Sequence, residues 1–167
     1  MIKQDKNTPQ ASIERQIDET RKVVAYCVND SDCRRVQVLQ YFGENFDRKK
    51  CRKRCDVCRE AAVMVEYDLT NESRNIIALV RHLQSRNVTS NYCQSIFYGS
   101  KKAEVVRAGH DQLEWHGAGS HLQQDVLEKL FMKLQLEQAL TEVSVNSQGG
   151  WHNSYLKVCF CFLHCRS

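Results

Sequence analysis

Four cysteines, Cys33, Cys51, Cys55 and Cys58, are the residues of this sequence best suited to carry chemistry. The last three crowd together with three and two residues between them, a spacing that lets one loop turn several sulfurs toward one centre. A more distant cysteine on a packed helix completes a tetrahedron around zinc. Six basic residues at positions 48–54 lower the pKa values of nearby thiols and so favour thiolate ligands. The pattern favours a closed, structural zinc site with no open position for catalysis.

A redox pair is the rival interpretation of Cys55 and Cys58. Such pairs normally occupy a strand-to-helix turn, and the surrounding sequence shows no such turn. A secreted disulfide scaffold fits poorly, because the nine cysteines are odd in number and no signal-peptide pattern precedes them. Cys27 and Cys93 lie on apolar helical faces and are expected to be buried, inert thiols. The cysteines of 159-CFCFLHC-165 are packed too closely to build a second metal cage.

Composition bounds the class of protein. The chain has 167 residues, 42% of them hydrophobic and 26% charged, which is enough for one compact domain or two small ones. No apolar run reaches the roughly 18 residues of a membrane span, so we expect a soluble intracellular protein without a membrane partner. Because the net charge is only +4, any nucleic-acid binding must come from local basic patches.

The first part of the chain reads as helices followed by a charged, cysteine-rich loop. Residues 1–11 form a flexible lead-in that contains the only proline. A helical pattern runs from Ser12 to Cys27, and residues 29–31 break it. A second helix is predicted from Asp32 through Phe42, with Gly43 as its stop signal.

The second part reads as three main helices followed by a β-hairpin, which is the element order of a winged helix. Helices are expected over 71–85 and 92–98, with a shorter one over 101–108. Ser120 and Gln123 have the form of a capping box before the last helix. The period then switches to two around Val143 and Val145, and 146-NSQGG-150 is turn chemistry before a return strand. The apolar faces of the first and last helices consist of Ile76, Ile77, Val80 and Leu83, and of Val126, Leu127, Leu130, Phe131 and Leu134.

Several motifs resemble one known family. Asp32-Cys33-Arg34-Arg35, then Tyr41-Phe42-Gly43-Glu44, then Cys51…Cys55-Asp56-Val57-Cys58 resemble the zinc-binding subdomain of RecQ-family DNA helicases. Phe97-Tyr98-Gly99-Ser100-Lys101, Gly117-Ala118-Gly119-Ser120 and Leu130-Phe131 are similar to the winged-helix (RQC) part of the eukaryotic Bloom and Sgs-like branch. Val57 stands where the family often has Asn, but that position lies between ligands and does not affect metal binding.

The resemblance implies a mainly α fold with a small β-hairpin: a helical zinc-binding subdomain over 12–66, followed by a winged helix over 67–158. The tail at 159–167 does not resemble the family. The implied function is the DNA-binding region of a 3′-to-5′ helicase in replication, recombination and repair, which places the chain in the nucleus. No G-x-x-x-x-G-K-[ST] phosphate loop is present, so this chain is not expected to hydrolyse ATP by itself.

Eight residues are candidate DNA contacts. Ser100 before two lysines is suited to a helix N-terminus that binds phosphate, although an ordinary N-cap with solvated lysines explains the same residues. Ser120 is a second such position. Trp151, in the turn of the hairpin, could stack on the last base pair of a duplex–single-strand junction or fold back onto the core. Five further residues complete the set. Two follow Ser100, one follows Trp151 and two follow Cys33: Lys101, Lys102, His152, Arg34 and Arg35.

Rival functions remain open from the sequence alone. A winged helix can dock proteins instead of DNA, in which case helicase motor domains or repair proteins are the expected partners. A zinc or thiol enzyme is disfavoured, because no paired acid and base accompany an open metal position. A non-functional helicase fragment is the third alternative.

Overall fold

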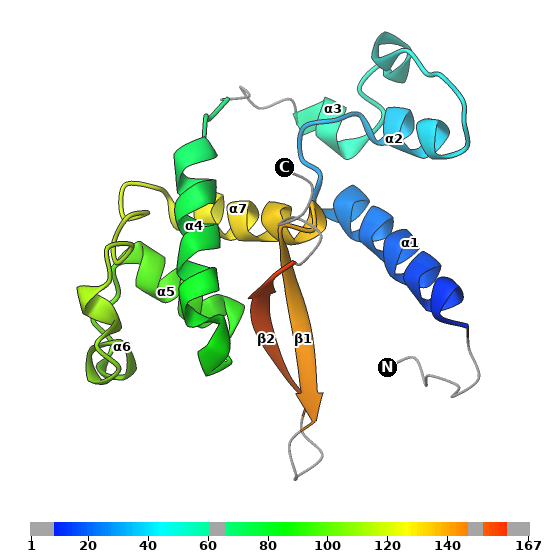
Figure 1. Cartoon of the computed structure of the whole chain (residues 1–167). Coiled ribbons are helices and arrows are strands. Elements are labelled where there is room, and N and C mark those ends of the chain that lie inside the picture. Colours follow the sequence, from blue (N-terminus) through cyan, green and yellow to red (C-terminus); the bar gives the residue numbers. More distant parts are fainter. Residues whose placement is uncertain (1–8, 61–65, 147–151, 160–167) are drawn as a thin grey trace. The chain divides into compact units, whose positions relative to one another are not determined.

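The computed structural model describes residues 9–60, 66–146 and 152–159 (Figure 1). The chain divides into two compact units, Met1–Glu66 and Tyr67–Ser167. The structure confirms the predicted fold class: mainly helical, with a two-stranded antiparallel hairpin and a cluster of cysteines.

The first unit is a set of short helices around the cysteines. Helices α1 (Gln10–Val28) and α2 (Arg34–Tyr41) are followed by a 3₁₀ turn, η1 (Arg48–Cys51), and by α3 (Asp56–Glu60). Asn29 separates α1 from α2, because its side-chain Oδ1 accepts hydrogen bonds from the backbone N–H groups of Ser31 and Asp32. The predicted helices are confirmed, although α2 begins at Arg34 rather than at Asp32.

The buried core of the first unit consists of cysteine side chains. Its buried hydrophobic residues within the described ranges are Cys33, Cys51 and Cys58, with Val36 and Phe46 packed beside them. Cys27 was expected to be buried, but the structure corrects this, because the thiol lies on an exposed face of α1.

The second unit has an ordinary apolar core. Its helices are α4 (Thr70–Leu83), α5 (Ser90–Tyr98), α6 (Ala103–Arg107) and α7 (Gln124–Leu136), with short 3₁₀ turns η2 (Gln84–Arg86) and η3 (His110–Gln112). The helical periodicity is confirmed, since one face each of α4 and α7 is buried. Cys93 is fully buried, as predicted. The largest fully buried side chains of this unit are Phe97, Phe131, Ile76, Leu79, Leu83, Ile96, Leu127, Leu140 and Leu156.

The hairpin consists of β1 (Leu140–Asn146) and β2 (His152–Val158). It pairs antiparallel, from Leu140 opposite Val158 at the base to Asn146 opposite His152 near the turn. The base is anchored in the core, because the Leu156 N–H donates to the Val88 carbonyl over 2.8 Å. The rest of the ribbon extends away from the helices of its unit (Figure 1).

A glycine-containing loop closes the end of α5. The N–H groups of Gly117 and Gly119 donate to the carbonyls of Ile96 and Phe97 over 3.1 and 2.8 Å. Both carbonyls belong to the last turn of α5, where no further turn of helix follows, although the Ile96 carbonyl also accepts the N–H of the C-cap residue Gly99. A Cβ atom at Gly119 would lie 2.4 Å from the Phe97 ring, so only glycine allows this approach.

Gly119→Ala should therefore destabilise the second unit by about 1–3 kcal/mol, the usual cost of overpacking a filled core. Phe97 is fully buried, so its ring can move away from a new methyl group only by displacing other core side chains. Chemical denaturation monitored by circular dichroism would measure the change.

Two controls separate the steric clash from other effects. Ser120→Ala alters an exposed neighbour and should change stability little. In a Phe97→Leu background the additional cost of Gly119→Ala should shrink, and an undiminished cost would show that the ring is not the cause.

Candidate zinc site and nucleic-acid interface

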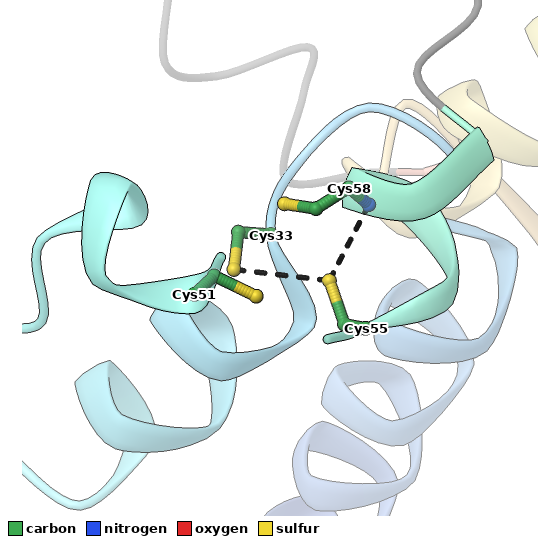
Figure 2. Close-up of side chains that lie close together, drawn as sticks. All are labelled: Cys33, Cys51, Cys55 and Cys58. Carbon is green, nitrogen blue, oxygen red and sulfur yellow. Dashed lines mark hydrogen bonds between the residues drawn. The ribbon is translucent and has the colours of Figure 1, made fainter. Parts of the chain in front are cut away.

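The four predicted cysteines come together at one point. The ligand atoms of Cys33, Cys51, Cys55 and Cys58 all lie within 4.8 Å of one another, and their side chains converge (Figure 2). Cys33 and Cys55 sulfurs are 3.9 Å apart. Four sulfurs at about 2.3 Å from a tetrahedral zinc ion would be separated by about 3.8 Å. The arrangement therefore fits a structural zinc ion and confirms that prediction.

Three short elements bring the sulfurs together. Cys33 is the residue before α2 and Cys51 ends η1. Cys55 is the residue before α3, and Cys58 lies within it. The Asp47 carboxylate starts η1 by accepting the Lys49 N–H over 2.9 Å. None of these elements is long enough to be stable in isolation, so the ligands must hold one another in place.

The protein prepares the thiols unequally for metal binding. The Cys58 backbone N–H, 3.4 Å from the Cys55 sulfur, lowers the pKa of Cys55 to about 6. The pKa of Cys51 is also lowered, chiefly by the backbone N–H of Cys55. Burial and neighbouring sulfurs raise the pKa of Cys58 to about 12. Cys55 thus offers a thiolate at neutral pH, whereas Cys58 gives up its proton only when a metal replaces it.

Arg34 is bound within the first unit. Its Nε lies 3.2 Å from both Asp56 carboxylate oxygens, and its Nη2 lies 3.1 Å from Oδ2. It also donates to the Tyr26 carbonyl, and its guanidinium lies 4.9 Å from the centre of the Tyr26 ring. Its proximity lowers the pKa of Asp56. Arg34 therefore joins the end of α1 to the ligand loop, while the adjacent Arg35 is exposed. The sequence alone could not assign these two roles.

The two serine positions differ from their predicted capping roles. Helix α6 begins at Ala103, and Ser100 instead accepts the Lys102 N–H over 3.3 Å in a turn before it. Helix α7 is preceded by Gln123 without a side-chain cap, and Ser120 lies in the preceding turn. The capping-box prediction is therefore wrong, because Ser120 belongs to the turn before α7, where its N–H donates to the Gly117 carbonyl.

The same loop brings the serine turns close together. Gly99 approaches Gly117, such that a Cβ at Gly99 would lie 3.1 Å from the Gly117 Cα. His116 Nε2 is 3.1 Å from the Ser100 carbonyl oxygen. Ser100 and Ser120, distant in sequence, thus flank one pair of touching glycines. Lys101 and Lys102 beside them are exposed.

Two of the predicted DNA contacts, Trp151 and His152, belong to the hairpin region of the sequence. Trp151 lies outside the described residues, and His152 is the first residue of β2. Along β1, Val143 and Val145 are each 44% exposed, so this face of the ribbon does not pack on the core.

A buried histidine network lies in the second unit, and no local pattern predicts it. His110 is the buried polar residue of the described chain, and its Nε2 is 2.7 Å from Arg86 Nη1. A guanidinium can only donate, so the proton of neutral His110 lies on Nδ1, 2.8 Å from the Tyr92 hydroxyl. The network joins the segment after α4, the helix α5 and the turn η3. Only the tertiary structure brings these residues together.

Comparisons with known proteins agree with both units. Residues 64–159 match the family model described as RQC domain, and residues 1–59 match the one described as RecQ zinc-binding. The chain is 41% identical over 160 residues to ATP-dependent helicase SGS1 of Saccharomyces cerevisiae, which covers 95% of the chain and 11% of that protein. It is 40% identical over 143 residues to ATP-dependent DNA helicase hus2/rqh1 of Schizosaccharomyces pombe, covering 86% of the chain and 11% of that protein.

A more distant relative shows the same pattern. RecQ-like DNA helicase BLM of Xenopus laevis is 32% identical over 137 residues, covering 72% of the chain and 10% of that protein. Fold and cysteine cluster together define a zinc-binding unit joined to a winged helix. The chain belongs to the RecQ helicase family and contains its zinc-binding and RQC regions. It spans about a tenth of the length of these relatives.

None of the helices in the described ranges combines the length and the apolar character that crossing a bilayer requires.

Cys55→Ser should reduce bound zinc from about one ion per chain to well below one, because it removes the sulfur whose lowered pKa makes it the readiest ligand. A chromogenic zinc assay on purified protein would measure the stoichiometry. Cys27→Ser is the matched control, since this exposed thiol lies outside the cluster and its loss should leave zinc unchanged. Equal zinc in both variants would contradict the assignment.

Acid should destabilise the second unit through His110. Burial, and then Arg86 and His82, lower the pKa of His110 below its usual 6.5. A lowered pKa means that protonated His110 is less favourable in the folded chain than in the unfolded chain. Neutral His110 therefore contributes fully to stability above about pH 6.5, and this contribution is lost as the pH falls through the pKa of His110 in the folded chain. Thermal unfolding between pH 8 and pH 5 would follow it.

His110→Gln should flatten this pH dependence, because glutamine can occupy the site without titrating. His121→Gln, which alters an exposed histidine paired with Glu72, should keep the wild-type slope. A steep acid loss that persists in His110→Gln would rule out His110 as its source.

Proposed function

We propose that this chain is the DNA-binding part of a RecQ helicase and recognises junctions between duplex and single-stranded DNA. The observation that carries the proposal is the hairpin, whose base is fixed in the core while its ribbon extends away from the helices (Figure 1). A two-stranded ribbon that is fixed at its base can be placed between the two strands where a duplex ends.

The outer part of the hairpin has suitable chemistry for contact with bases. Val143 and Val145 expose apolar surface along β1. In this proposal Trp151, which precedes β2 in the sequence, stacks on the last base pair, and His152 adds a polar contact. Base–aromatic stacking contributes roughly 1–3 kcal/mol, which is comparable to the cost of opening one base-pair step.

Phosphate contacts would hold the duplex in place. The turns that contain Ser100 and Ser120 flank the contact between Gly99 and Gly117, and Lys101 and Lys102 extend into solvent beside them. Hydroxyls, backbone N–H groups and lysines are the usual phosphate ligands and carry little sequence information. Arg35 is a further exposed candidate, whereas Arg34 is bound to Asp56 and would act by supporting the zinc loop.

The relatives are ATP-dependent helicases by name, and strand separation driven by ATP would require motor domains as partners of this region. We infer a role in replication, recombination and repair, and a nuclear location, from this kinship. A protein-interaction role is the alternative, for which the exposed apolar groove between α1 and α2, lined by Val23, Val38, Tyr41 and Phe42, offers a surface.

The two kinds of contact should be separable by mutation. Replacing Lys101 and Lys102 by Ala should weaken binding to forked and fully paired DNA alike and reduce the slope of log K against log salt by up to about 2, because up to two phosphate contacts are lost. Trp151→Ala should leave that slope unchanged and weaken fork binding by roughly 5- to 150-fold relative to duplex binding. Fluorescence anisotropy with fork and duplex of equal length measures both effects.

Lys133→Ala, at an exposed lysine of α7 already paired with Glu137, controls for the loss of one surface charge. Wild-type binding that is insensitive to salt would contradict phosphate recognition. Equal affinity of the wild type for fork and duplex, unaltered in Trp151→Ala, would contradict junction recognition.

A further inference from the structure

The loop that connects the zinc ligands carries an unusual density of positive charge. Six of the seven residues at 48–54 are Lys or Arg, and the seventh is the ligand Cys51. All six basic residues are exposed. Within the described part of the chain, none of the six forms a salt bridge. We call residues 48–54 the basic loop.

The tip of the basic loop has a defined backbone. Arg52 and Lys53 both have left-handed conformations, with φ of 49° and 58°. Residues with a Cβ atom adopt this conformation at a cost of roughly 1–2 kcal/mol each. The Arg54 N–H closes the turn on the Cys51 carbonyl over 3.0 Å. Because Cys51 and Cys55 lie on either side of the tip and both belong to the sulfur cluster, a bound metal holds this conformation from both ends.

Balancing the charge of the metal site does not account for so many cations. Four thiolates around Zn²⁺ carry a net charge of about −2, which two basic residues would compensate. Nearby carboxylates offset only part of the rest, since Asp56 is already paired with Arg34 and Asp47, which accepts the Lys49 N–H, adds one negative charge. An excess of positive charge therefore remains exposed on a rigid turn.

We propose that the basic loop binds the phosphodiester backbone of nucleic acid, as a contact of the zinc-binding unit separate from the serine turns and the hairpin. A protein partner would be expected to need an apolar centre with aromatic anchors, and the loop from Arg48 to Arg54 contains no apolar side chain apart from the buried Cys51. A polyanion requires only spaced cations. The proposal rests on the DNA-binding function inferred above and extends it to the first unit.

The loop can be neutralised without disturbing its backbone. Asn tolerates the left-handed conformation better than Arg or Lys, so Arg52→Asn with Lys53→Asn removes two charges and should preserve the turn. The matched control is Arg15→Gln with Arg21→Gln, which removes the same charge from α1 and keeps good helix-forming residues. Both variants should retain the zinc content of the wild type.

The test measures the affinity of the full chain for a mixed-sequence duplex between 0.05 and 0.3 M salt, by fluorescence anisotropy. If each cation contacts one phosphate, the loop variant should lower the slope of log K against log salt by about 1.8, which is roughly 60-fold in affinity at 0.1 M salt. The control should lose much less. Chelation of zinc from the wild type should reproduce the loss, and should weaken the loop variant little further.

An unchanged slope and affinity in the loop variant, at full zinc content and with DNA binding by the wild type, would overturn the proposal while leaving the function of the second unit intact. So would a loop variant that keeps duplex affinity but loses binding to poly-glutamate, since that result assigns the loop to an acidic protein. Failure of the wild type to bind duplex or fork would instead refute the proposed function itself.

Discussion

The convergence of four sulfurs on one point is the interaction on which the first unit depends. Short helices gain stability mainly by burying an apolar face, and this unit has almost none to bury. Its described core is Cys33, Cys51 and Cys58, with half-buried Val36, Phe46 and Cys55. Units this small usually require a metal or a disulfide to compensate for the conformational entropy lost on folding. Metal–sulfur bonds therefore take the role in this unit that the hydrophobic effect has in the second unit. Arg34, which binds both Asp56 of α3 and the Tyr26 carbonyl of α1, connects the end of α1 to the metal site.

In the second unit, an apolar core and backbone hydrogen bonds, rather than a metal, hold the exposed turns in place. Its helices share a continuous apolar core, and the glycine loop is attached to α5 by two backbone hydrogen bonds. Gly99 and Gly119 are needed there because side chains would collide with Gly117 and Phe97. The backbone of the turns that contain Ser100 and Ser120 is thus ordered on folding. The proposed phosphate contacts would not have to pay for that ordering, and such preorganisation raises affinity without adding contacts.

Much of this could be predicted from the sequence, for reasons that differ by element. The long helices and the hairpin follow from local periodicity, and the ligand set from cysteine spacing. The starts of α6 and α7 could not be predicted from capping patterns, because Ser100 and Ser120 make their contacts in turns that precede these helices. The apolar pattern of α1 predicted a buried Cys27, and this was wrong. In the described structure the apolar face of α1 is exposed, with Ile17 and Val23 also open to solvent. Arg34 and Arg35 are chemically equal neighbours, and only the position of Asp56 distinguishes them.

The candidate DNA contacts in both units share one physical design, in which a tertiary constraint rather than a regular helix fixes a short basic turn. In the basic loop the constraint is the sulfur cluster, and beside Lys101 and Lys102 it is the contact between two glycines. A net charge of +4 is too small to attract DNA over long distances, so the cations must act locally and from fixed positions. When two linked units each bind a few phosphates weakly, the second contact forms at the high effective concentration set by the linker. Modest local charge on two rigid turns can then provide an affinity that neither unit would reach separately.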